Sequence, residues 1–159
     1  MDSSAAATRV LIVGLDLALC GGLAEVIASR AQVHCCNSFR SALAYMDAVA
    51  QDLIVTDLRL AEYNGLHLVY RARVAGSPAR AIVYDKDGDL GVAAEVHRAG
   101  AFFEVANRLL ITLPSYIAAP LPPSDRRVPT RFDRRAEPRG GRRLWDRHIL
   151  SSEMSSILG

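Results

Sequence analysis

Short apolar runs alternate along the chain with segments in which apolar residues recur every three or four positions. Apolar runs of about five residues are typical of strands buried on both faces of a sheet. The wider spacing is typical of helices that cover such a sheet. Strands are expected over residues 9–13, 32–36, 52–57, 79–84 and 102–106, and helices over residues 17–30, 38–50, 66–74, 87–99 and 112–119.

This alternation predicts an α/β fold of (βα)5 type: a flavodoxin-like, doubly wound sheet of five parallel strands with helices on both faces. Local signals support the boundaries. Asn37 or Ser38 can begin the second helix, and Asn64-Gly65 is a turn signal. Gly100 suits the end of the fourth helix, and Thr112 is expected to cap the fifth.

Ligands and chemistry in such folds lie beyond the carboxyl ends of the strands. Six residues end or directly follow the strands on this side of the sheet, and they are therefore the candidate site residues. They are Gly14, Leu15, Asp16, Asp57, Asp85 and Asn107.

The composition changes after residue 119, where proline and arginine become frequent and large apolar residues become rare. We therefore expect a folded domain over residues 8–118 and a disordered tail over residues 119–159, with a short helix near its end. The first 117 residues carry 10 basic and 12 acidic groups, whereas the remainder carries 9 basic and 5 acidic groups. The basic tail is either a solubilising segment or an electrostatic anchor for nucleic acid, an acidic protein or anionic lipid.

Three cysteines, Cys20, Cys35 and Cys36, form neither a metal-binding nor a disulfide pattern. This favours a reducing compartment, and we expect the cytoplasm. The residues before Thr8 do not resemble a signal peptide. No apolar run approaches the ~20 residues of a membrane span. The cysteines are interpreted either as small buried residues or, for Cys35 and Cys36, as a thiol redox sensor.

Motifs of common enzyme classes are missing from the sequence. Gly14 is followed by further glycines only at positions 21 and 22, so the first turn lacks a dinucleotide cradle. Lys86 does not follow a phosphate-binding loop, and the four histidines are scattered. We therefore expect that the chain is not an enzyme in its own right.

Three segments carry a resemblance to a known family. Ile12-Val13 ends the first strand, and Arg98 to Ala101 forms the turn into the last strand. Between them, Leu53 to Leu60 with Asn64-Gly65-Leu66 forms a strand, loop and turn around Asp57. In this order, residues 8–118 resemble response-regulator receiver domains. The resemblance implies two-component phosphorelay signalling, with Asp57 at the phosphoacceptor position and a histidine kinase, a phosphotransfer protein or a downstream effector as partner.

The resemblance also implies a Mg²⁺ site, which this sequence supports poorly. In the family an acidic pair follows the first strand, and its positions here hold Gly14 and Leu15, with only the next residue, Asp16, acidic. Mg²⁺ requires near-octahedral oxygen ligands. A cation held by Asp16, Asp57 and a backbone carbonyl near Arg59 would be bound weakly. Asp16 can equally be interpreted as the cap of the helix that follows it.

The other positions that the resemblance implies also differ. Asp85 stands where the family has Ser or Thr, and Asn107 stands where it has Lys, with Arg108 in place of Pro. A carboxylate at position 85 would repel an arriving phosphoryl group by about 2–4 kcal/mol at an effective dielectric of ~20. Glu104, beside Phe103, replaces the family's aromatic switch residue.

Simpler interpretations of these aspartates remain open. Asp57 can be an aspartate that caps the following loop through Asx hydrogen bonds. Asp85 can belong, with Asp87 and Asp89, to a solvated helix start. A further alternative is a weak cation site formed by Asp16, Asp57 and Asp85.

The first hypothesis is a stand-alone, degenerate receiver that acts as a protein-interaction module and is phosphorylated poorly or not at all with Mg²⁺. The resemblance implies that its partner surface comprises the helix at 87–99, the strand at 102–106 and the helix that follows. The alternatives are a nucleic-acid-associated regulator that uses the arginine-rich tail, with weak and salt-sensitive binding, and the thiol sensor.

Overall fold

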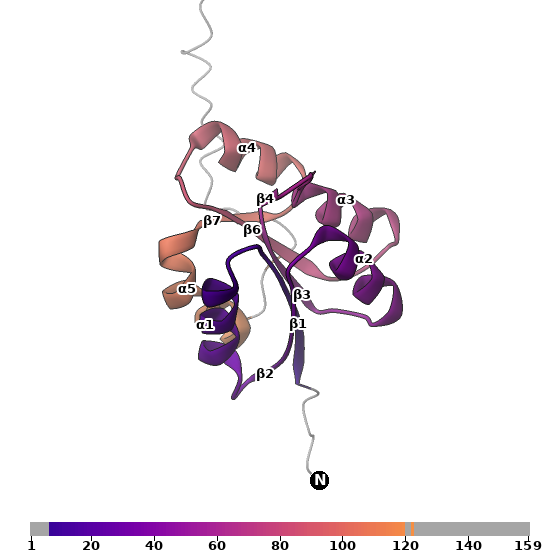
Figure 1. The fold of residues 1–159 in the computed structure, drawn as a ribbon, viewed down its shortest axis with the longest axis vertical. Helices are drawn as coiled ribbons and strands as arrows, with labels where there is room; N and C mark the ends of the chain where they lie inside the picture. Colours follow the sequence, from indigo (N-terminus) through magenta and orange to yellow (C-terminus); the bar gives the residue numbers. More distant parts are fainter. Residues whose placement is uncertain (1–6, 120–121, 123–159) are drawn as a thin grey trace, which may run out of the picture. The chain divides into compact units, whose positions relative to one another are not determined.

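Five parallel strands form the sheet around which the helices of the folded domain pack (Figure 1). The computed structural model describes residues 7–119 and residue 122. The strands follow the order β2-β1-β3-β6-β7, which confirms the predicted doubly wound (βα)5 fold. Their bounds are β1 Thr8–Val13, β2 Ala31–Cys36, β3 Leu53–Asp57, β6 Arg80–Asp85 and β7 Phe102–Val105. The predicted tail and its short helix lie outside the described residues.

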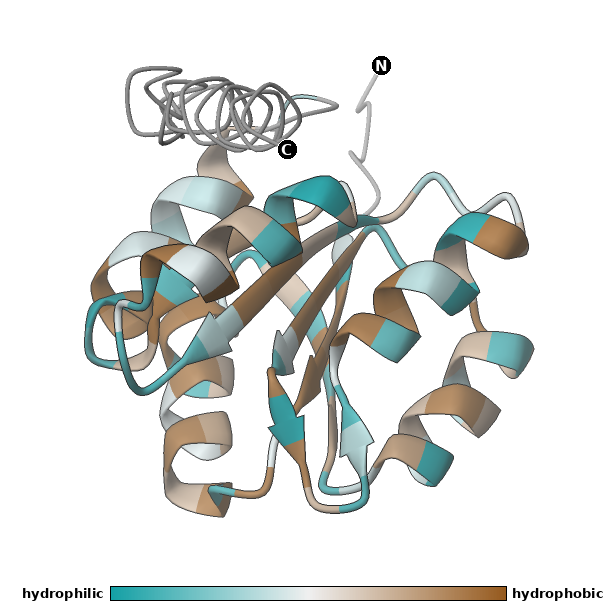
Figure 2. Ribbon diagram, turned by 90° about the horizontal axis from the view of Figure 1, so that it is seen from above, coloured by the Kyte–Doolittle hydropathy of each residue, from teal (hydrophilic) through white to brown (hydrophobic). Residues whose placement is uncertain are grey.

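Helices cover both faces of the sheet, and Figure 2 shows the hydrophobic strands enclosed between them. One face carries α1 (Leu17–Ile27) and α5 (Ala106–Ala118), and the other carries α2 (Phe39–Ala48), α3 (Leu66–Val74) and α4 (Leu90–Arg98). Side chains of successive strand residues alternate between these two cores, since strands have a period of two. Burial of each large aliphatic side chain contributes about 1.5–3 kcal/mol. No helix among the described residues is long and apolar enough to cross a membrane.

Helix starts are fixed by side-chain caps. Asp16 accepts a hydrogen bond from the backbone N of Leu19, at 3.0 Å, so the capping interpretation of Asp16 is confirmed. Of the two candidates for α2, Ser38 is the cap. Asp89 accepts hydrogen bonds from two backbone N–H groups of α4. At the other end of α4, Gly100 adopts a φ of 82°, a left-handed conformation that glycine adopts at low cost.

Two sequence-based expectations were wrong. The last helix begins at Ala106 and not at Thr112, because Leu109 and Leu113, four residues apart, are both buried against the sheet and extend the helical face. The Thr112 hydroxyl donates to the carbonyl of Arg108 inside this helix and caps nothing. The loop after β3 also contains a hairpin, β4 (Arg59–Leu60) and β5 (Tyr63–Asn64), which is too short to leave a periodic pattern.

The carboxyl ends of β1, β3 and β6 lie side by side because the strands pair in register. Val13 lies opposite Thr56, and Asp57 lies opposite Tyr84. Asp85, the last residue of β6, lies opposite Val105 of β7. The sheet therefore brings Gly14, Asp57 and Asp85 together at the carboxyl ends of its strands, as the sequence predicted.

Candidate functional site

Asp57 ends β3 with its side chain half-buried at this end of the sheet. Its Oδ1 accepts a hydrogen bond from the backbone N of Arg59 at 2.8 Å, which is the Asx bond considered above. Burial raises the pKa of the Asp57 carboxyl, and the nearby charge of Asp85 raises it further. The Arg59 N–H and the charges of Lys86 and Arg59 oppose this rise. The folded chain thus holds Asp57 in a place that disfavours its charged form.

Replacing Asp57 by asparagine is expected to raise the free energy of unfolding at neutral pH. The folded-state pKa of Asp57 lies above its ordinary value of 3.8, so the charged carboxylate destabilises the folded chain. Asparagine keeps an oxygen that can accept from the backbone N of Arg59. The gain should shrink as pH falls through the raised pKa and vanish below the ordinary value, where both states are protonated. Urea unfolding of the wild-type and Asp57→Asn chains across this pH range measures the gain in the free energy of unfolding. A gain that is independent of pH would contradict a raised pKa of Asp57 as its cause.

Asp85 is buried, with its side chain 3% exposed, and the expectation that it belongs to a solvated helix start is wrong. The guanidinium of Arg59 lies 3.4 Å from both carboxylate oxygens, through Nε to Oδ1 and Nη2 to Oδ2. Burial of a charge is tolerated because of this pairing. Arg59 therefore contacts both aspartates: its backbone N–H donates to Asp57, and its guanidinium pairs with Asp85. Asp87 and Asp89 are exposed, as expected.

The space beside Gly14, where the resemblance implies an acidic side chain, is occupied. A Cβ built on Gly14 would lie closer than 3.0 Å to the Tyr84 hydroxyl oxygen and 3.0 Å from the Cys20 Sγ. Real Cβ atoms essentially never come as close to a heavy atom as the contact with the Tyr84 hydroxyl, and the contact with Cys20 Sγ is tighter than most. Tyr84 is only 2% exposed. An aspartate at position 14 and a tyrosine at position 84 are thus mutually exclusive without a structural shift.

The Tyr84 hydroxyl makes no hydrogen bond of ordinary geometry within the described part of the chain, although the Cys20 thiol lies beside it. Burial is the main cause that raises the pKa of the phenol, and the neighbouring thiol and carboxylates act in the same direction. Tyr84 is therefore neutral at physiological pH. Leaving a buried hydroxyl unpaired costs about 1–3 kcal/mol, so the position of this ring is set by the packing around it.

The remaining predicted site residues do not converge on Asp57. Leu15 is 48% exposed, and the carboxylate of Asp16 is engaged in capping α1. Asn107 is exposed in the first turn of α5. Among the described residues, no group of three or more His, Cys, Asp or Glu side chains is arranged to hold a metal ion. The cation site of Asp16, Asp57 and Asp85 considered above is therefore not formed.

Two further features near the carboxyl ends of the strands could not be predicted from sequence patterns. A Cβ at Gly65 would lie closer than 3.0 Å to the backbone oxygen of Asp57 and to the Thr56 hydroxyl, so the Asn64-Gly65 turn is required by close packing under the site. Glu104, 6% exposed, accepts hydrogen bonds from the Tyr116 hydroxyl at 2.9 Å and from the backbone N of Val105. The carboxylate, at the position where the resemblance implies an aromatic residue, is thus held between β7 and α5.

The cysteines divide into two buried thiols, Cys20 and Cys36, and one exposed thiol, Cys35. Burial raises the pKa of all three, to about 11 for Cys20. Thiolate is the reactive form, so a raised pKa makes each less reactive. Cys35 and Cys36 are successive strand residues and point to opposite faces of the sheet. These features disfavour the thiol-sensor hypothesis.

Comparison with known proteins identifies the fold. No family model and no curated protein matches the sequence significantly. Among solved structures, a receiver domain of a Francisella response regulator superposes with a TM-score of 0.64 at 14% identity, covering 70% of this chain and 93% of that one. A CheY-like receiver domain protein from Methanospirillum hungatei gives 0.61 at 19% identity, covering 70% and 94%.

A third similar structure is a response regulator from Burkholderia pseudomallei that contains a phosphorylated aspartic acid and a calcium ion. Its TM-score is 0.59 at 20% identity, and the match covers 70% of this chain and 69% of that one. At 14–20% sequence identity, these structural superpositions establish the fold and nothing more. The chain has the fold of response-regulator receiver domains, which confirms the predicted resemblance at the level of structure.

Proposed function

We propose that this protein is a degenerate receiver that acts as an interaction module in two-component signalling and not as an enzyme. Asp57 occupies the phosphoacceptor position, at the carboxyl end of β3. Its partner is a histidine kinase, a phosphotransfer protein or a downstream effector. The partner surface comprises α4, β7 and α5, on which Leu90 and Ile111 are 85% and 78% exposed.

The observation that carries the degenerate character is the tyrosine that fills the space beside Gly14. Phosphoryl transfer depends on positive charge that neutralises the oxygens of the transferred group, and a Mg²⁺ ion is the usual source. Here the position of an acidic ligand is closed by the Tyr84 phenol, which carries no charge. Arg59 does supply a positive charge near Asp57, but its guanidinium is paired with the Asp85 carboxylate. Little net positive charge remains for an incoming phosphoryl group.

The test is incubation of the full chain with acetyl phosphate and Mg²⁺, followed by intact-mass measurement. We expect no increase by the mass of one phosphoryl group on a timescale that labels a conventional receiver treated in parallel. The physical reason is the combination of a closed cation pocket and an Arg59 charge that is already paired with the Asp85 carboxylate.

The matched control is Asp57→Asn, which removes the acceptor carboxylate and keeps a side chain of the same shape. Rapid labelling of the wild-type chain that disappears in Asp57→Asn would show a working phosphoacceptor, and the degenerate assignment would then be wrong. Labelling that survives in Asp57→Asn would place the modification on another residue.

A further inference from the structure

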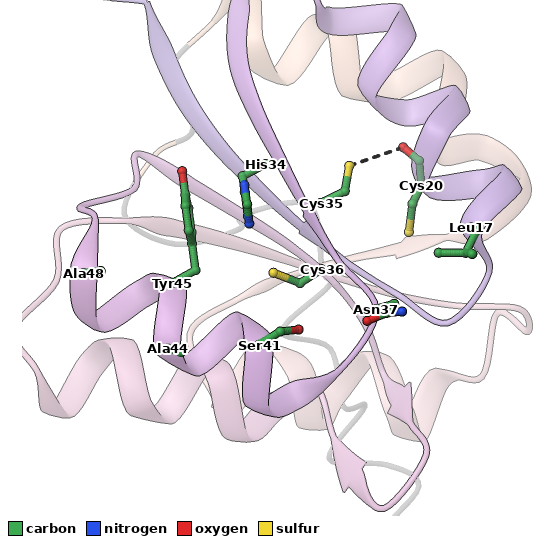
Figure 3. Close-up of a pocket in the computed structure, with 10 residues that line it drawn as sticks. All are labelled: Leu17, Cys20, His34, Cys35, Cys36, Asn37, Ser41, Ala44, Tyr45 and Ala48. Carbon is green, nitrogen blue, oxygen red and sulfur yellow. Dashed lines mark hydrogen bonds between the residues drawn. The ribbon is translucent and has the colours of Figure 1, made fainter.

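A groove runs along the open edge of the sheet, where β2 is the last strand (Figure 3). Its volume is about 620 Å³. The edge of β2 lies between two helices, so that α1 contributes one wall and α2 the other. On the α2 side, the rings of His34 and Tyr45 stack with their centroids 3.7 Å apart and nearly parallel planes. On the α1 side, Cys35 points toward Cys20.

The lining of this groove carries no formally charged side chain, although 23% of the chain's residues are charged. On the α2 wall the side chains are mostly small, with Ser41, Ala44 and Ala48 beside Tyr45. Small residues on the wall leave room for a backbone to approach. A charged occupant would lose hydration without gaining a partner charge. The groove is therefore suited to an uncharged segment.

The edge of β2 also offers unpaired backbone groups. In a parallel pair, alternate residues direct both their N–H and C=O groups toward the neighbouring strand. The carbonyl of Cys36 accepts from the backbone N of Gly14, so Cys36 and His34 face β1. By alternation, Val33 and Cys35 direct their N–H and C=O groups away from β1, and no described strand pairs with them there. Such an edge is a template for another strand.

We propose that the β2 edge is a docking site for an extended, uncharged peptide segment of a partner protein, which adds to the sheet as a sixth parallel or antiparallel strand. Backbone hydrogen bonds to Val33 and Cys35 would supply affinity. Alternate side chains of the segment would lie on the α1 and α2 walls, and small or β-branched apolar residues fit there. A second copy of this chain is a poorer fit, because its own β2 edge is flanked by the same two helices.

The probe is an array of uncharged peptides of about ten residues, built from Val, Ile, Thr, Ala and Ser, which are strand-forming or small. The best binder is labelled, and its dissociation constant for the full chain is measured by fluorescence anisotropy. N-methylation of alternate backbone amides then provides the decisive variant. Methylating the set of amides that faces β2 should abolish binding, whereas methylating the other set should leave it intact.

Two substitutions in the protein test the same site. Val33→Pro removes one N–H at the open edge and leaves the pairing with β1 untouched, and we expect about tenfold weaker binding, the equivalent of one hydrogen bond. Ala44→Arg obstructs the α2 wall at an exposed position, so it weakens binding without perturbing the core. Val74→Arg is the control, since Val74 is 85% exposed at the end of α3 and does not line the groove.

Hydrogen exchange of the complex should show new protection at β2. Three results would overturn the proposal. These are an array in which no peptide binds, equal binding of both N-methylated probes, and protection confined to another surface. A chain that dimerises in sedimentation experiments, and that becomes monomeric in Ala44→Arg, would assign the edge to a second copy and would also refute it. None of these results bears on phosphorylation at Asp57, so this site and the proposed signalling role can fail separately.

Discussion

Replacing Gly14 by alanine is expected to destabilise the wild-type chain by about 2 kcal/mol and to cost much less in a chain that also carries Tyr84→Phe. Added atoms in a packed interior typically cost about 1–3 kcal/mol. The new Cβ would meet the Tyr84 hydroxyl oxygen at less than 3.0 Å. Phenylalanine removes that oxygen, and the ring atom Cζ lies at an ordinary contact distance of 3.7 Å. The Cys20 Sγ at 3.0 Å remains, so a smaller part of the cost persists in the double variant. Urea unfolding followed by circular dichroism measures all four chains of this double-mutant cycle.

Two features of the cycle make its outcome specific. Tyr84→Phe alone should raise the free energy of unfolding by up to about 1–3 kcal/mol, because the hydroxyl that it removes is buried without a hydrogen-bond partner in the described part of the chain. Gly21→Ala is the matched control for adding a methyl group, since a Cβ there meets nothing within 4 Å and alanine favours the helix interior. If Gly14→Ala costs the same free energy in both backgrounds, then the hydroxyl does not close the pocket.

The elements of this fold could be predicted from sequence because each is encoded locally. Buried parallel strands appear as uninterrupted apolar runs, and a single residue such as Asp16 or Ser38 fixes a helix start through one hydrogen bond. The last helix was misplaced because its start at Ala106 follows β7 directly, without a cap side chain or a loop that would mark the boundary.

The site could be predicted only in part, because its chemistry depends on pairs of residues that are distant in sequence. Register placed Asp57 and Asp85 at one edge, and the absence of an acidic side chain at position 14 was visible in the sequence. That Arg59 neutralises Asp85, 26 residues away, requires knowing where the side chain folds. Tyr84 carried one available signal: it is an aromatic residue with a polar hydroxyl that follows three buried aliphatic residues of β6. The close approach of its hydroxyl to Gly14 could not be predicted, because Tyr84 lies in β6 and Gly14 directly follows β1, and β3 lies between these two strands.

The close approach of the Tyr84 hydroxyl to Gly14 changes the interpretation of the missing acidic pair. A sequence that has only lost its metal ligands would regain a cation site when they are restored. A sequence whose pocket is also filled would not. The neighbouring position shows the contrast, because Leu15 is 48% exposed and an aspartate there would not meet Tyr84, whereas an aspartate at position 14 would.

A chain that carries both Gly14→Asp and Tyr84→Val is therefore expected to bind Mn²⁺ or Mg²⁺ with a dissociation constant of about 1 mM, at the weak end of protein sites for hard cations. The new carboxylate would share the cation with Asp57, and removal of the phenol would provide the room. Valine retains a strand-forming side chain in β6. Neither the wild-type chain nor Leu15→Asp should bind at this concentration. Isothermal titration calorimetry and the Mn²⁺ electron paramagnetic resonance signal measure the affinity.

The control for this gain of binding is Gly14→Asn with Tyr84→Val, which has the same shape as the first double variant without its charge. If it binds the cation equally well, the ligand is not the new carboxylate. The more informative comparison is Gly14→Asp with Tyr84 retained. Because Tyr84 is 2% exposed and packs in one core cluster with buried residues of α1 and α5, this chain should be destabilised and should not bind. Binding by a folded Gly14→Asp chain as tight as that of the double variant would show that the tyrosine is no barrier, and that only the acidic side chains had been lost.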